Sequence, residues 1–138
     1  MKNNEPANFA RIRKIMLPKD YLAYVLTGTF ATDYSDASGM LLLDVENKCW
    51  SKEMCDIAGI TVDMLPALHE SYDNIGNVKP EFNLPNAIVA IGAGDNAAAA
   101  VGTGTVGAGT CNISLGTSGT IFIPNEKFGV DSNNALHS

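Results

Sequence analysis

Apolar side chains recur at helical spacing along the first part of the chain. Pro6 suits the first position of a helix, because the N–H group that proline lacks is unpaired there in any case. Apolar positions between Phe9 and Met16 then follow at intervals of three and four residues. The pattern predicts a helix from Pro6 that Pro18 ends, unless Pro18 begins the next helix.

The next segments predict short elements separated by capping residues. A second apolar face covers residues 21–26, and Gly28 fits a helix C-terminal cap. The polar segment TDYSDASG, residues 32–39, predicts a loop or a short capped helix. An apolar run over residues 40–45 predicts a strand. Ser51 and Gly59 suit the two ends of another short helix, and Thr61 suits the cap of a further turn.

The pattern changes in the middle of the chain. Residues 71–85 keep no period and gather Asn, Asp, Gly and Pro, whereas residues 87–119 hold almost no charges and are dominated by Gly, Ala and Thr. We therefore predict two regions, residues 1–80 and residues 81–138. The second region predicts, in order, a strand (residues 87–91), a glycine turn, a helix (95–101), a strand (110–115), a tight turn (116–119) and a strand (120–123).

Composition and charge narrow the class of protein. Apolar residues make up 46% of the chain and charged residues 17%, which is typical of a folded globular domain. The net charge of -6 argues against nucleic acid or an anionic membrane as the main partner. No apolar run approaches the roughly 20 residues needed to span a bilayer, and the first residues lack a signal-peptide core.

The cysteines and histidines of the sequence indicate neither a disulfide framework nor a metal site. The three cysteines form no CxxC pair and cannot all pair with one another, so we predict a reduced, cytoplasmic chain with buried, inert thiols. His69 and His137 show no metal-ligand spacing, and we predict no metal site from them.

The stretch IGAGDNAAAAVG, residues 91–102, places a single carboxylate directly after an apolar strand. Glycines before Asp95 let the backbone approach a ligand closely. Two compatible interpretations of Asp95 stay open. It caps the following helix, where free N–H groups stabilise negative charge, or it accepts a proton from a substrate hydroxyl.

The segment SLGTSG, residues 114–119, places Gly116, Thr117 and Ser118 between two apolar strands. Such a tip offers backbone N–H groups and two hydroxyls, which suit phosphate oxygens. A plain hairpin turn favours the same residue types. The segment matches neither the Walker phosphate loop nor the GxGxxG dinucleotide fingerprint.

Four segments together resemble, in the same order, the FGGY family of carbohydrate kinases: MLPKDYLAYVLTG, TDYSDASGMLLLDVENKCWS, GAGDNAAAAVG and SLGTSG. The resemblance runs through almost the whole chain and is closest to the members that phosphorylate D-xylulose. It implies an α/β chain that is an internal fragment of an actin-like, ribonuclease-H-like ATPase fold. Residues 1–80 would be the C-terminal part of the first kinase domain, and residues 81–138 the start of the second.

The resemblance also implies roles for particular residues. Asp95 would be the general base on the sugar hydroxyl that attacks the γ-phosphate of ATP, and Asp95 and Asn96 would bind the sugar. Asparagine at Asn96, where glycerol kinases carry glutamine, favours D-xylulose. Gly116, Thr117 and Ser118 would hold the transferring phosphate. ATP and Mg²⁺ are implied as cofactors, without a visible set of metal ligands.

The resemblance places the first phosphate loop and the adenosine-binding part outside this segment. We therefore expect the isolated fragment to be inactive. We also expect it to expose apolar surface through which it would form homo-oligomers.

The other charged residues of the first half are predicted to be structural. The carboxylates are expected to cap helices and turns: Asp33, Asp36 and Asp44. The cations are expected to lie on solvated helix surface: Arg13, Lys14 and Lys19. Trp50 is predicted to be a packing anchor.

Three other functions are weighed against the leading one. The first is another FGGY kinase, acting on glycerol, ribulose or gluconate. The second is a non-catalytic sugar-binding sensor on the same fold, which would have no need of a base at Asp95. The third is a structural Gly/Ala-rich domain, which the simultaneous presence of several polar motif residues disfavours.

Overall fold

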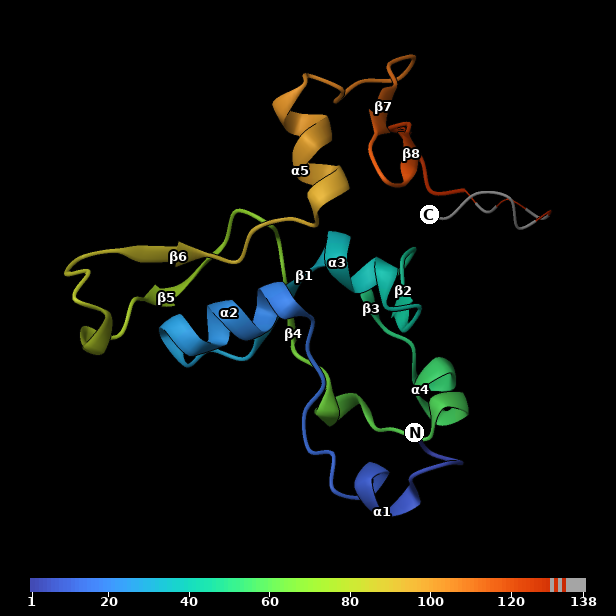
Figure 1. The fold of residues 1–138 in the computed structure, drawn as a ribbon. Coiled ribbons are helices and arrows are strands. Elements are labelled where there is room, and N and C mark those ends of the chain that lie inside the picture. Colours follow the sequence, from blue (N-terminus) through green and yellow to red (C-terminus); the bar gives the residue numbers. More distant parts are fainter. Residues whose placement is uncertain (130, 132, 134–138) are drawn as a thin grey trace.

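The computed structural model describes residues 1–129, 131 and 133 (Figure 1). The helices, in chain order, are α1 (Pro6–Phe9), α2 (Pro18–Thr27), α3 (Tyr34–Gly39), α4 (Lys52–Ala58) and α5 (Asp95–Gly102), with 3-10 turns η1 (Val62–Met64) and η2 (Pro80–Phe82). The strands are β1 (Ala31–Asp33), β2 (Leu43–Asp44), β3 (Cys49–Trp50), β4 (Ala67–His69), β5 (Asn74–Asn77), β6 (Ile88–Ala90), β7 (Asn112–Leu115) and β8 (Gly119–Phe122).

The described strands pair two by two. β1 and β4 are parallel, while β2–β3, β5–β6 and β7–β8 are antiparallel. Figure 1 shows three arms that meet at β1 and α3: one arm holds α2, β5 and β6, another holds α1 and α4, and the third holds α5, β7 and β8. The candidate site lies where these arms meet.

Two predicted helices of the first half, α2 and α4, are confirmed with their ends, and residues 34–39 adopt the capped helix rather than the loop. Pro18 begins α2, and Gly28 ends it in the left-handed conformation at φ 84°. The Asp33 side chain caps α3 by accepting from the N–H groups of Ser35 and Asp36. Ser51 caps α4 by accepting from the N–H of Met54.

The long N-terminal helix is a wrong prediction. Helix α1 ends at Phe9, and the chain over residues 12–17 is not helical. The Ile15 N–H donates to the Met64 carbonyl at 2.8 Å, and the Ile15 side chain packs against a buried cluster formed by Cys55, Ile60 and Leu65. Packing against distant residues therefore overrides the local helical spacing.

The strand predicted over residues 40–45 is shorter than expected. Met40 caps the end of α3, Leu41 has a positive φ of 60°, and only Leu43–Asp44 pairs as β2. The segment without a period contains β5, which sequence analysis missed. Its Gly76 lies at a register shift against β6, which breaks the alternation that identifies a strand.

The second region follows the predicted order. Strand β6, helix α5 and the hairpin β7–β8 fall within two residues of the predicted ranges. Residues 130, 132 and 134–138 of this region, His137 among them, lie outside the described residues.

Buried apolar side chains form two small clusters. Ala23, Ala31, Ile75 and Ile91 join α2, β1, β5 and the end of β6. The second cluster, around Cys55, joins α4 to the N-terminal segment, and Trp50 packs against it while its Nε1 donates to the Pro66 carbonyl at 2.8 Å. Trp50 is thus the predicted packing anchor.

The cysteines depart from the prediction of buried thiols. Cys55 is buried, whereas Cys49 and Cys111 are exposed, and all three are free. Cys49 lies in a two-residue edge strand and Cys111 directly before β7, so neither has a layer packed over it. None of the described helices combines the length and apolar content that crossing a membrane requires.

Candidate active site

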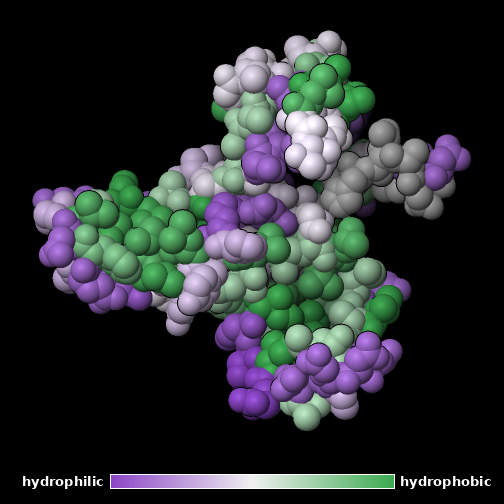
Figure 2. Space-filling view, viewed as in Figure 1, coloured by the Kyte–Doolittle hydropathy of each residue, from purple (hydrophilic) through white to green (hydrophobic). Residues whose placement is uncertain are grey.

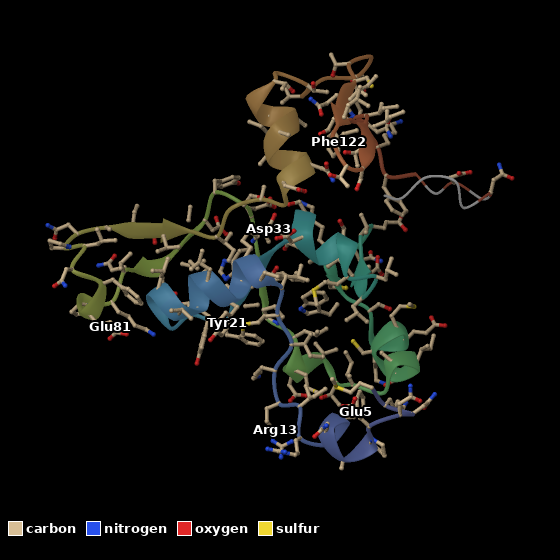
Figure 3. All side chains as sticks on the ribbon, in the orientation of Figure 1. Glu5, Arg13, Tyr21, Asp33, Glu81 and Phe122 are labelled. Atoms are coloured by element: carbon tan, nitrogen blue, oxygen red, sulfur yellow. The ribbon has the colours of Figure 1, made fainter. Side chains whose placement is uncertain are left out.

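Lys19, in the first turn of α2, is the centre of a buried polar network. Its Nζ lies 3.1 Å from Asp33 Oδ1, 3.3 Å from Asp20 Oδ1 and 3.3 Å from Asp36 Oδ2. The Asp33 and Asp20 side chains are 0% and 1% exposed. One cation thus faces three carboxylates at the junction of the three arms, where Figure 3 labels Asp33.

Asp33 is saturated by donors from three parts of the chain. Its Oδ2 accepts from the Ser35 N–H, the Ser35 hydroxyl and the Ser71 hydroxyl, the last at 2.7 Å. Burial alone would raise the pKa of this carboxyl, but the hydrogen bonds from Ser35, Ser71 and Lys19 and the lysine charge hold its pKa below the ordinary value. Asp33 therefore caps α3, as predicted, and also fixes the lysine.

Lys19 and Asp36, the two partly exposed members of the network, both have a raised pKa. Burial would lower the pKa of Lys19, but the hydrogen bond to Asp33 and the surrounding carboxylates outweigh it and raise that pKa. Burial raises the pKa of Asp36, and the negative charges of Asp33 and Asp20 add to it, while Lys19 opposes the change. Burial is thus the main cause for Asp36, whereas the surrounding carboxylates raise the pKa of Lys19 against the effect of burial.

The network also holds the segment between β6 and α5. Lys19 Nζ donates to the carbonyls of Ile91 and Gly92, both at 3.2 Å. The Gly94 N–H donates to the Ser35 hydroxyl oxygen at 2.8 Å. A Cβ at Gly94 would lie 2.8 Å from Asp36 Oδ1, which explains why the close approach requires glycine here.

Asp95 is the first residue of α5, and Gly94 is the N-cap. The interpretation of Asp95 as the helix cap is therefore wrong in position, although its Oδ1 accepts from the neighbouring Asn96 N–H at 2.8 Å. The Asp95 side chain is exposed and lines a hollow of about 410 Å³. The hollow is lined by Leu17, Pro18, Lys19, Asp36, Ala93, Gly94 and Asp95.

The other predicted site residues lie outside this hollow. Asn96 is exposed on the next position of α5, and Gly116, Thr117 and Ser118 form the exposed tip of the β7–β8 hairpin. Strand β8 contacts α5, so the hairpin lies beside the helix that begins with Asp95. Phe122, at the end of β8, is labelled in Figure 3 on this arm. The structure thus brings Asp95 to the Lys19 network and leaves the predicted phosphate hairpin separate from it.

No group of three or more His, Cys, Asp or Glu side chains among the described residues is arranged to hold a metal ion. The three carboxylates that converge do so on the Lys19 ammonium, which occupies the point between them. His69 contacts Asp73 through Nδ1 at 3.3 Å. The described residues therefore do not form a Mg²⁺ site on their own.

Lys19 is the residue that sequence reasoning missed, because it was expected on solvated helix surface. A signal was available. A lysine in the first turn of a helix faces the positive end of the helix dipole, which disfavours a cation. Directly after Pro18 and beside Asp20, such a lysine needs carboxylate partners, and the nearby motif carries Asp33 and Asp36.

Comparison with solved structures defines the class of protein. A ligand-bound xylulose kinase from Lactobacillus acidophilus is 26% identical with a TM-score of 0.91 over 96% of this chain and 28% of that chain. A gluconate kinase from the same organism is 27% identical with a TM-score of 0.83 over 87% of this chain and 25% of that chain. The chain is thus an α/β part of the actin-like, ribonuclease-H-like ATPase fold of sugar kinases.

The family follows from the sequence comparison. The FGGY family of carbohydrate kinases, N-terminal domain, matches residues 1–102, and the chain belongs to this family. A xylulose kinase from Klebsiella pneumoniae is 44% identical over 100% of this chain and 29% of its own length. The chain therefore spans less than a third of the length of this relative. The domain match extends past residue 80, and the boundary predicted there stays a prediction.

Proposed function

We propose that the protein transfers the γ-phosphoryl group of ATP to a sugar hydroxyl, with D-xylulose as the substrate. Family membership and the 44% identity to a xylulose kinase support the proposal. The observation that carries it is the position of Asp95: an exposed carboxylate at the start of α5, lining a hollow beside Lys19 and Asp36.

Asp95 is proposed as the general base. Its carboxylate would take the proton from the attacking sugar hydroxyl while the oxygen forms a bond to the γ-phosphorus and ADP leaves. The carboxylate is exposed, and within the described residues its only hydrogen bond comes from the Asn96 N–H, so it can receive a substrate proton. Asn96 would donate to and accept from sugar hydroxyls.

The hairpin tip is proposed to hold the transferring phosphate. Within the described chain, the N–H groups and hydroxyls of Thr117 and Ser118 make no hydrogen bond, while the Gly116 N–H donates to the Ser118 carbonyl. Two oriented N–H groups and two hydroxyls at an exposed glycine-containing tip suit phosphate oxygens. Phosphoryl transfer mainly requires such positioning and charge stabilisation.

Mg²⁺ would neutralise charge on the phosphates of ATP. The described residues offer no cluster of side chains that would ligate it. The first phosphate loop and the adenine site are expected in parts of the protein beyond this segment.

Gluconate is the alternative substrate, because a gluconate kinase matches 87% of the chain with a TM-score of 0.83, against 0.91 for the xylulose kinase of the same organism. The higher identity to a xylulose kinase, 44% against 27%, favours D-xylulose.

The proposal is tested by ADP release from the full-length protein with D-xylulose, D-ribulose, D-gluconate and glycerol. D-xylulose is expected to be the best substrate. Asp95→Asn is expected to lower kcat by on the order of 10²–10⁴-fold, because the general base is lost while the size of the side chain is kept. Residues 1–138 alone are expected to release no ADP. A matched control is Asp56→Asn, an exposed carboxylate on α4.

Two results would contradict the proposal. If none of the sugars stimulates ADP release, the kinase assignment is wrong and a sugar-binding sensor becomes the better explanation. If Asp95→Asn is as fast as the wild type, the phosphotransferase has another base.

A further inference from the structure

The segment that carries Asp95 is held from outside its own region. Its side-chain anchors are the Lys19 ammonium, which donates to the carbonyls of Ile91 and Gly92, and the Ser35 hydroxyl oxygen, which accepts from the Gly94 N–H. The Ile91 and Gly92 N–H groups also donate to backbone carbonyls of the segment after β4. Lys19 and Ser35 lie more than fifty residues earlier in the sequence than the backbone groups they bind. These three hydrogen bonds lie directly before Asp95.

The anchors are themselves fixed by buried charge. Asp33, which is fully buried, accepts from both the Lys19 ammonium and the Ser35 hydroxyl. Asp20, also buried, holds Lys19 from the other side at 3.3 Å. A lysine held by two buried carboxylates cannot change its rotamer without leaving a buried carboxylate without its cation, which is strongly unfavourable.

We propose that Lys19 and Ser35 are positioning residues for Asp95: they hold residues 91–94 so that the carboxylate at the start of α5 reaches the substrate hydroxyl. The catalytic consequence rests on the proposed function. The positioning itself does not, because it concerns the conformation of residues 91–95 in the protein without substrate.

The geometry gives a physical reason for an effect on rate. A general base must lie within hydrogen-bond reach of the proton it takes. A misplacement of about 1 Å can cost on the order of 10²-fold in rate. The N–H groups of Ile91 and Gly92 stay bonded to the carbonyls of Asp73 and Ser71, so removing the two anchors loosens mainly residues 93–95. Gly94 offers little conformational resistance there.

Lys19 also lines the hollow, so a direct contact with substrate is the competing explanation. A double-mutant cycle separates the two. If Lys19 acts through Asp95, then Lys19→Met is expected to lower kcat by about 10²-fold in the wild type and to change little once Asp95→Asn is present. A lysine that contacts substrate directly would slow both backgrounds by the same factor.

Ser35→Ala is the sharper variant, because it removes one hydroxyl and keeps every charge. It is expected to lower kcat by roughly tenfold in the wild type. Like Lys19→Met, it should change kcat little once Asp95→Asn is present. Ser35→Thr keeps the hydroxyl and is expected to restore most of the rate. Lys52→Met, a change at an 82% exposed lysine on α4, is the matched control for Lys19→Met.

Hydrogen exchange of the peptide covering residues 89–97 in the full-length protein gives a readout that does not need activity. Faster exchange in Lys19→Met and Ser35→Ala, with wild-type exchange in Ser35→Thr and Lys52→Met, would support the inference. Unchanged exchange in the first two variants, or rate effects that add to that of Asp95→Asn, would overturn it. If exchange changes as expected but the wild-type protein phosphorylates no sugar, the proposed function fails and the positioning stands.

Discussion

At the scale of single residues, one buried carboxylate organises the site. Asp33 accepts hydrogen bonds from Ser35 and Ser71 and forms an ion pair with Lys19. All of these donor–acceptor distances are 3.1 Å or shorter. Donors from α2, α3 and the segment after β4 therefore converge on a side chain that carries its charge inside the protein. Such a group stabilises the fold only while it is ionised.

Asp33→Asn is expected to lower the free energy of unfolding by about 1–3 kcal/mol at neutral pH, because Ser35, Ser71 and Lys19 lose a charged acceptor inside the protein. The pKa of Asp33 lies below its ordinary value of 3.8, so its contribution is complete above pH 3.8 and is lost as pH falls through the lower folded-state pKa. Thermal unfolding midpoints of the full-length wild type and variant should therefore converge below pH 3.8.

Lys19 and Asp36 also make pH-dependent contributions to the stability of the fold. The raised pKa of Lys19 makes its contribution complete below pH 10.5 and lost as pH rises through the higher folded-state value. The raised pKa of Asp36 works in the opposite sense to that of Asp33, since its contribution is complete below pH 3.8 and is lost as pH rises through the raised value. Equal midpoints for wild type and Asp33→Asn at neutral pH would show that Asp33 is not ionised in the folded state.

At the scale of elements, the ends of helices are set by local chemistry. Helix α2 ends because Gly28 adopts φ 84°, and its N–H donates to the Tyr24 carbonyl at 2.7 Å. This conformation is open to glycine and costs other residues steric energy. The sequence could predict these helix ends because the capping residues act on their own neighbours.

Gly28→Ala is expected to destabilise the protein by about 1–2 kcal/mol, through the left-handed backbone alone. An added Cβ would meet Lys79 Cε at 3.5 Å, which is ordinary contact. Gly39→Ala is the matched control: it ends α3 without a positive φ and has open space around it, so it should stabilise by about 0.4–1 kcal/mol. Denaturant unfolding measures both, and equal effects of the two changes would refute the conformational argument.

The elements that sequence analysis missed or misplaced depend on distant contacts. Residues 12–17 carry a helical pattern but form no helix, because Ile15 packs against the Cys55 cluster and its N–H donates to the Met64 carbonyl. Strand β5 lacks alternation but pairs with β6 through a register shift. In both cases the partner lies far enough away in sequence that no local pattern could reveal it.

At the scale of the whole molecule, the buried core is small and much apolar surface is exposed. Figure 2 shows hydrophobic residues spread over the arm of α2, β5 and β6. Exposed apolar side chains there include Leu22, Leu84 and Ile88 at 60%, 54% and 64% exposure. The β7–β8 hairpin is similar, with Leu115 at 86% and Ile121 at 69%. Patches of this kind usually mark surfaces that contact other protein.

Residues 1–138 alone are therefore expected to self-associate. Sedimentation velocity over a range of concentrations should show a mass that rises above the 14.6 kDa of one chain. Replacing Leu115 and Ile121 together by lysine should reduce the association, because it places charge on the hairpin surface, while a control with two changed surface residues on α4 should not. A single species of monomer mass at every concentration would contradict the prediction.

The sequence by itself determined the ends of α2 and α4, the order of elements in the second half and the family, since caps, turns and motif residues act locally or are recognised as a pattern. It also identified Asp95 and the Gly116–Thr117–Ser118 tip as candidates, whose roles stay proposals. Only the tertiary structure decided that the Lys19 ammonium lies among Asp20, Asp33 and Asp36 and that it holds the segment before Asp95. The physical reason is distance: the lysine and the carbonyls it binds are 72 and 73 residues apart, so their contact exists only once the arms have met.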